Sequence, residues 1–196
     1  MQSPDVIRER LATIQQQVGE SVTIVAATKY VALHDMTTLL DAGITVVGEN
    51  RAQDLEAKHA EYGDAFRWHF IGHLQSNKVK VINRLCELVH SLDSDSAARR
   101  LEVPALVQVN LAGEGSKSGV EPHEIAAYLA YDVRGLSTMP PAAATPEESR
   151  PWFGRLRGLA AEHGLQELSM GTTQDYAIAA EEGATYIRVG SVLFAV

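Results

Sequence analysis

Short apolar runs of strand length recur along the chain, and an amphipathic stretch follows most of them. In LHDMTTLLDAG, for example, Met36, Leu39 and Leu40 fall on one face of a helix that Gly43 can end. The runs predict strands at residues 22–27, 44–48, 68–72, 87–91, 104–110, 131–137, 165–170 and 185–190. Because the pattern repeats strand and helix in turn, it predicts βα units and a parallel sheet.

Eight such units in 196 residues favour an α/β fold of the closed (β/α)8 TIM-barrel type. An open, doubly wound sheet is the alternative. With no linker or low-complexity run in view, we expect residues 1–196 to form a single domain. The segments 94–101 and 121–131 are short for crossovers, which need about ten to twelve residues. We expect shortened helices there, or residues absent from the chain.

The composition narrows the class of protein. Hydrophobic residues make up 45% of the chain and charged residues 21%, as in soluble globular proteins. The net charge of −8 disfavours binding to a phosphate backbone, so we expect no nucleic acid as partner. No apolar run approaches the roughly 20 residues that span a bilayer. The polar N-terminus and the single Cys86 favour the cytoplasm over secretion.

Candidate chemistry should lie where strands end, because α/β barrels carry their sites at the carboxyl ends of the strands. Lys29 follows the first strand, where its amine could turn inward over the barrel mouth and be shielded from water. A desolvated lysine is a good nucleophile toward carbonyl groups. The alternative is a solvated lysine at a strand end.

The next two strands end in polar residues. Glu49 and Asn50 follow the second, and Asn50 could cap the following helix or bind a ligand. After the third, His69 and His73 lie four residues apart but on either side of a strand end, which is not the helical spacing of zinc sites. We therefore expect no metal and assign His73 an orienting role at the mouth.

The last two strands end in small and hydroxyl-bearing residues that suit an anion. The segment GTT at 171–173 lies at a predicted helix N-terminus, and Arg188, Gly190 and Ser191 close the eighth strand. Free backbone N–H groups at these two loops form the commonest phosphate site of TIM barrels. Together with the amine of Lys29, they would accommodate a flat phosphorylated aldehyde, which describes pyridoxal 5'-phosphate (PLP).

Eight segments of the chain resemble, in order, the signature segments of pyridoxal phosphate homeostasis proteins. These are VAATKY, GENRAQD, WHFIGHLQSNK, HSLD, VQVNLAGEGSKSGV, GLSTMPP, LSMGTTQDYAIA and IRVGSVLF. The resemblance implies a barrel like the N-terminal domain of alanine racemase. It also implies that Lys29 forms the Schiff base, that Asn50 lies beside the cofactor ring and that Arg188 faces the pyridine nitrogen.

By the same resemblance, Thr173, Gly190 and Ser191 contact the phosphate. The family's usual MGMS segment is MGTT here, which keeps a hydroxyl at Thr173. The resemblance thus implies the cofactor-binding set Lys29, Asn50, Thr173, Arg188, Gly190 and Ser191.

Three functions remain open on the sequence. Arg188 at the ring nitrogen would weaken carbanion chemistry, and racemisation needs acid/base groups on both faces of the substrate carbon. Because the chain ends at Val196 without a second domain, we favour a non-catalytic, monomeric PLP carrier that serves vitamin B6 homeostasis and possible recipient apoenzymes. A PLP-dependent racemase or lyase, and a Schiff-base aldolase acting on sugar phosphates, are the alternatives.

Overall fold

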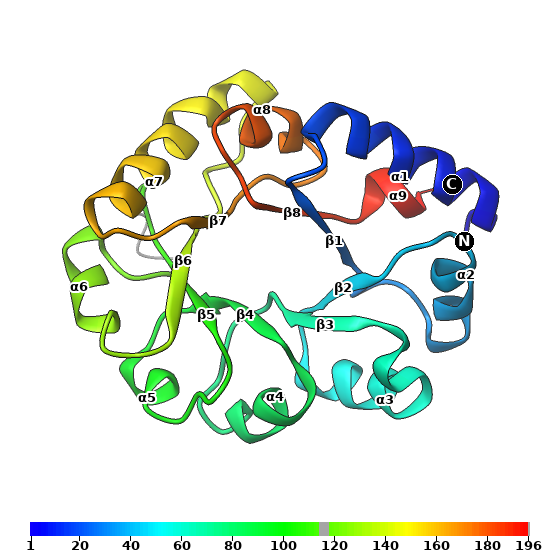
Figure 1. The fold of residues 1–196 in the computed structure, drawn as a ribbon, viewed down its shortest axis with the longest axis horizontal. Coiled ribbons are helices and arrows are strands. Elements are labelled where there is room, and N and C mark those ends of the chain that lie inside the picture. The colour runs from blue at the N-terminus through cyan, green and yellow to red at the C-terminus, as the bar shows by residue number, and fades with distance from the viewer. Residues whose placement is uncertain (114–117, 196) are drawn as a thin grey trace.

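The computed structural model of the protein describes residues 1–113 and 118–195. Within them, eight parallel strands follow one another around a closed barrel (Figure 1). The strands are β1 (Thr23–Ala27), β2 (Val46–Glu49), β3 (Arg67–Phe70), β4 (Leu88–Leu92), β5 (Ala105–Gln108), β6 (Val133–Ser137), β7 (Glu167–Ser169) and β8 (Tyr186–Val189). The predicted barrel is confirmed, and the open sheet is wrong because β8 pairs with β1 from Thr23↔Tyr186 to Ala26↔Val189.

Helices form a ring outside the strands (Figure 1). They are α1 (Pro4–Val18), α2 (Met36–Asp41), α3 (Ala52–Tyr62), α4 (Val79–Leu85), α5 (Asp95–Ala98), α6 (Ile125–Tyr128), α7 (Arg150–Glu162), α8 (Tyr176–Glu181) and α9 (Ser191–Phe194). The sequence interpretation omitted α1, although Ser3 caps it and Pro4 begins it. The two ends of the chain meet where the Gln2 amide donates to the Ala195 carbonyl at 2.9 Å.

The two shortened crossovers are confirmed. Helices α5 and α6 have four residues each, against 13 in α7 and 11 in α3. A 3-10 turn, Pro122–Glu124, leads into α6, and Glu121 and Glu124 close it with a reciprocal capping box. Four residues of the glycine-rich segment between β5 and this turn, 114–117, lie outside the described residues.

Alternation along the strands sends successive side chains to opposite sides of the barrel wall. The layer between helices and sheet is mostly apolar and includes the fully buried Leu55, Phe153 and Leu156. On the other side, His90 of β4 bonds Ser169 of β7. These two strands are not neighbours in the sheet, so the bond crosses the barrel interior. The fold therefore has a mostly apolar outer layer and several polar groups inside.

Candidate functional site

Lys29 lies just beyond β1, at the barrel mouth formed by the carboxyl ends of the strands. A turn begins there, because Val31 N–H donates to the Thr28 carbonyl at 2.9 Å. Lys29 is exposed, and its Nζ lies 4.9 Å from the centre of the Tyr30 ring, which is itself 90% exposed. The expected shielding of this amine is therefore wrong: the strand stops at Ala27, before the barrel wall can cover the side chain.

Asn50 follows β2, the strand beside β1. It does not cap α3, because the N-cap residue is Arg51 and no side chain bonds the first turn. The Asn50 Oδ1 atom is buried and has no hydrogen-bond partner among the described residues. A Cβ on Gly72 would lie 2.0 Å from the Asn50 carbonyl oxygen, so only glycine fits at that point of the β3 loop. Asn50 thus presents an unused acceptor at the mouth.

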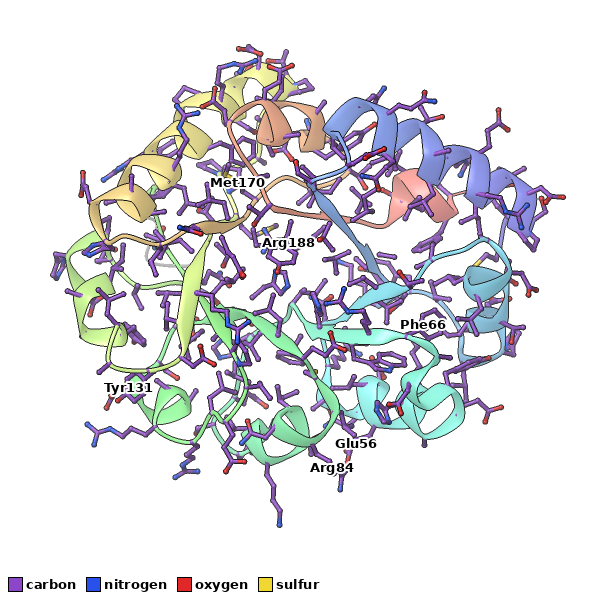
Figure 2. All side chains as sticks on the ribbon, in the orientation of Figure 1. Glu56, Phe66, Arg84, Tyr131, Met170 and Arg188 are labelled. Atoms are coloured by element: carbon purple, nitrogen blue, oxygen red, sulfur yellow. The ribbon has the colours of Figure 1, made fainter. Side chains whose placement is uncertain are left out.

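Arg188 points from β8 into the barrel, and Figure 2 shows it near the centre of the ring of strands. Its Nη2 donates to the Thr138 carbonyl at 2.7 Å, which ties β8 to the end of β6. Burial lowers the pKa of the guanidinium to about 10, so Arg188 stays cationic at neutral pH. The buried Nε has no partner within the described residues. Arg188 therefore offers a free donor beside the mouth.

The loops after β7 and β8 come together at one hydroxyl group. Thr173 Oγ1 accepts from the backbone N–H of Gly190 at 3.4 Å and of Val192 at 3.5 Å. A Cβ on Gly190 would lie 3.2 Å from the Ala27 carbonyl oxygen, so a side chain there would crowd β1. Ser191 begins α9 directly after Gly190. These small residues and N–H groups form the kind of cradle that holds an anion.

The sequence placed the 171–173 segment at the start of a helix, and this expectation needs correction. Helix α8 begins at Tyr176, and its N-cap residue is Asp175. The Asp175 carboxylate accepts from the N–H and the hydroxyl of Thr172 at 2.7 and 3.1 Å. A turn closed by Asp175 therefore separates Thr173 from the helix.

The sequence did not predict the contacts among the buried polar groups below Arg188. His90 Nδ1 lies 2.7 Å from Ser169 Oγ, and its Nε2 lies 2.9 Å from His69 Nδ1. The Tyr186 ring packs edge-on against both imidazoles. Burial and then Arg67 lower the pKa of His69 to about 4, and burial, His69 and Arg188 lower the pKa of His90 well below its usual value. Both imidazoles are therefore neutral at pH 7.

The sequence also did not predict a buried ion pair. Glu49 belongs to the mouth in the sequence interpretation, yet its side chain turns outward to α3, where Oε1 lies 2.6 Å from Lys58 Nζ. Strand alternation explains this, because Glu49 and Asn50 are consecutive and face opposite sides. A polar residue directly before Asn50 and a lysine on the following helix were the available signals.

His73 was assigned an orienting role, and its Nδ1 lies 3.6 Å from Asp93 Oδ2 at the ends of β3 and β4. Burial raises the pKa of Asp93, against the opposing effect of His73. Among the described residues, no three His, Cys, Asp or Glu side chains gather as a metal ion would require. Nor does any helix in residues 1–113 and 118–195 have the length and apolar character needed to cross a membrane.

A pocket of about 410 Å³ opens on the β5–β7 side of the mouth. Its wall includes Gln108, Met139, Thr172 and Asp175. Met139 also connects the pocket to Arg188, because the Met139 Sδ lies 3.1 Å from Arg188 Nη2. The mouth therefore has room for a small molecule beside the cradle.

The fold and the mouth define a class: a (β/α)8 barrel with a lysine after β1, a buried arginine in β8 and an anion cradle between β7 and β8. No protein-family model matches the chain. The pyridoxal phosphate homeostasis protein of Aquifex aeolicus is 35% identical over 214 residues, covering 96% of this chain and 94% of that protein. The corresponding protein of Deinococcus radiodurans is 38% identical over 204 residues, covering 96% of each. The chain belongs to the pyridoxal phosphate homeostasis protein family.

Solved structures agree with this assignment. PipY of Synechococcus elongatus, solved with PLP bound, superposes with a TM-score of 0.87 at 35% identity and covers 96% of this chain and 99% of its own. A lysine/ornithine decarboxylase of Vibrio vulnificus, 16% identical, matches in fold alone, with a TM-score of 0.74 over 97% of this chain and 62% of its own. The 214-residue alignment with the Aquifex protein exceeds the 196 residues of this chain, so that relative has residues that this chain lacks.

Proposed function

We propose that this protein binds PLP at the barrel mouth, holds it as a Schiff base on Lys29 and thereby takes part in vitamin B6 homeostasis. The observation that carries the proposal is the meeting of the β7 and β8 loops at Thr173 Oγ1, beside Arg188 with its unpartnered Nε. A phosphate needs such a cradle, and a pyridine nitrogen needs a nearby donor. The family membership and the PLP-bound PipY structure support the same conclusion.

Each candidate residue has a role that its chemistry allows. Lys29 would supply the amine that reacts with the aldehyde. Asn50 would lie beside the ring with its free Oδ1, and the Arg188 Nε–H would donate to the ring nitrogen. When bound, the cofactor supplies a reactive aldehyde and an electron-accepting ring.

The phosphate would lie at the other end of the site. Thr173, Gly190 and Ser191 would hold it through hydroxyl and N–H donors, and Gly190 allows the close approach. The cradle and Arg188 would therefore fix the phosphate and the ring nitrogen of a flat ligand. Lys29 would be free to reach its aldehyde group.

We propose a carrier and not an enzyme, because a cationic Arg188 leaves the ring nitrogen unprotonated and so weakens carbanion chemistry. The exposure of Lys29 fits a cofactor that must be taken up and released at the surface. We further propose that residues 1–196 act as one cytoplasmic, monomeric domain that can supply PLP to apoenzymes. In the described residues the large exposed apolar side chains are few, namely Met1, Tyr30, Leu33, Leu129 and Met139, as in monomers.

The test is the absorption spectrum of the purified protein with PLP, before and after borohydride reduction, followed by peptide mapping. We expect a visible band that borohydride removes and a reduced adduct on Lys29. Lys29→Ala should remove both, while Lys80→Ala, which changes an exposed lysine of α4, should keep them.

Three results would contradict the proposal. A Lys29→Ala protein that keeps a reducible band would move the covalent bond to another lysine. Amino-acid turnover at ordinary enzyme rates, lost with Lys29, would make the protein a racemase or lyase. A protein that stays colourless with PLP but forms a reducible adduct with sugar phosphates would be an aldolase.

A further inference from the structure

One ion pair is buried in the layer between the barrel and α3, directly behind the proposed Schiff-base site. Lys58 Nζ lies 2.6 Å from Glu49 Oε1 and donates to the Thr28 carbonyl at 2.7 Å. The Thr28 hydroxyl donates to the same Glu49 oxygen at 2.6 Å. All three residues are at most 5% exposed. Desolvating two charges costs about as much as their attraction returns, so fold stability alone accounts poorly for this pair.

The position of the pair ties it to the barrel mouth. Thr28 follows β1 and precedes Lys29, and Glu49 ends the neighbouring strand β2 and precedes Asn50. Thr28 N–H donates to the Gly48 carbonyl at 3.0 Å, which extends the pairing of the two strands to this point. The Lys58 ammonium therefore holds the peptide group that joins Thr28 to Lys29, and the carboxylate that precedes Asn50.

The two charges of the pair balance each other. Glu49 Oε2 is buried and has no partner within the described residues, so Lys58 is the cation that balances this carboxylate there. Two other titratable groups lie close to Lys29 or to Glu49. The Tyr30 ring lies against the Lys29 amine, and the Cys86 thiol stays neutral because burial and then Glu49 raise its pKa to about 12.

We propose that Lys58 and Glu49 are positioning residues that hold the Lys29 turn and keep the charge behind it neutral, so that the Lys29 amine can react. This inference rests on the proposed function of Lys29. It assigns opposite effects to the two partners. Loss of Lys58 leaves an uncompensated carboxylate that attracts positive charge behind Lys29, whereas loss of the Glu49 charge leaves an uncompensated cation that repels it.

The test measures the reactivity of Lys29 without cofactor. The apoprotein is labelled with acetic anhydride at pH 8, and mass spectrometry compares acetylation of Lys29 with that of the exposed Lys80 as internal reference. Lys58→Met should lower the relative reactivity of Lys29 by about tenfold, because an unbalanced buried carboxylate attracts the charged amine. Glu49→Gln should raise it, and the double variant should return toward the wild type.

A nonspecific structural role predicts a different result, because damage to the turn would change Lys29 reactivity in the same direction in all three variants. Such a result, or unchanged labelling in both single variants, overturns the inference. If Lys58→Met does not give a folded protein by circular dichroism, Lys58→Gln leaves the same uncompensated carboxylate and can still donate to the Thr28 carbonyl. We expect lowered reactivity there too.

The PLP spectrum separates this inference from the proposed function. A wild-type protein that forms no Schiff base with PLP contradicts the proposed function, yet the labelling series still reports on the ion pair. A wild-type protein with a Lys29 adduct and identical labelling in every variant keeps the proposed function and removes the positioning role. With both correct, PLP should bind more weakly to Lys58→Met than to the double variant.

Discussion

The layer outside the barrel wall and the space inside it are built on different chemistry. Outside, Phe153 and Leu156 of α7 and Leu55 of α3 are fully buried in one continuous apolar cluster. Inside, His69, His90, Ser169 and Arg188 are buried as well, yet all are polar. TIM barrels more commonly fill this interior with branched apolar side chains. The interior of this barrel is therefore more polar than usual, although it also holds the buried Val25, the β1 partner of Arg188.

The difference shows that the outer layer mainly stabilises the fold, whereas the interior mainly orients side chains. Apolar burial has no preferred orientation and grows with the area removed from water, so the outer layer can supply most of the folding free energy. A buried polar group costs free energy unless it has a partner, and a hydrogen bond fixes direction. The bond of Arg188 to the Thr138 carbonyl thus orients the guanidinium toward the mouth without adding much to stability.

The largest expected effect comes from the outer layer. Phe153→Ala should lower the free energy of unfolding by about 3–5 kcal/mol, because it removes a fully buried ring and leaves a cavity. Urea denaturation followed by circular dichroism measures this loss. The matched control is Leu129→Ala at a 40% exposed position, which should change stability by no more than about 0.5 kcal/mol. Equal losses in the two variants would remove the distinction between the layers.

The second effect belongs to the interior and depends on pH. The folded protein lowers the pKa of His69 from 6.5 to about 4, so the fold favours the neutral imidazole. The stability that His69 contributes is therefore fully present above pH 6.5. It falls as the pH drops toward 4, because the unfolded chain takes up the proton first. This one group should contribute a loss of about 3 kcal/mol at pH 4.

His69→Asn isolates that contribution, since an amide can replace the Nδ1 contact to His90 but does not titrate in this range. Urea midpoints at pH 7 and pH 4 are compared for the variant and the wild type. The variant should lose less stability between the two pH values, whatever its stability at pH 7. An identical loss in both proteins would show that His69 is not the group that responds to acid.

The same contrast explains what the sequence could predict. Apolar runs and glycine ends predicted all eight strands and the barrel, because strand period and burial leave a direct trace in the pattern. The site followed only in part. Thr173 and Gly190 do come together, but Lys29, which lies two residues beyond the end of β1, is exposed.

The interior contacts left no comparable trace in the sequence. His90 and Ser169 are 79 residues apart, and their contact depends on strands that face each other across a closed barrel. The pair of Glu49 with Lys58 depends on which side of the strand each residue faces. A one-residue change in register would reverse that side, so the strand boundaries must be known before such a pair can be predicted.

The smallest effect tests the hydrogen bonds inside the barrel. Ser169→Ala leaves His90 Nδ1 without its 2.7 Å partner, and an unsatisfied buried nitrogen should cost about 1–2 kcal/mol of unfolding free energy. Ser21→Ala, at an exposed position, is the control and should be close to neutral.

Nitrogen-15 NMR of the imidazoles gives a second measurement. With Ser169 present, the protons in the chain Ser169–His90–His69 can point in either direction, since each imidazole can donate or accept. Without the hydroxyl, His90 gains nothing from a proton on Nδ1, so the tautomer with the proton on Nε2, donating to His69 Nδ1, should dominate. Unchanged tautomers together with unchanged stability would mean that this bond does not order the barrel interior.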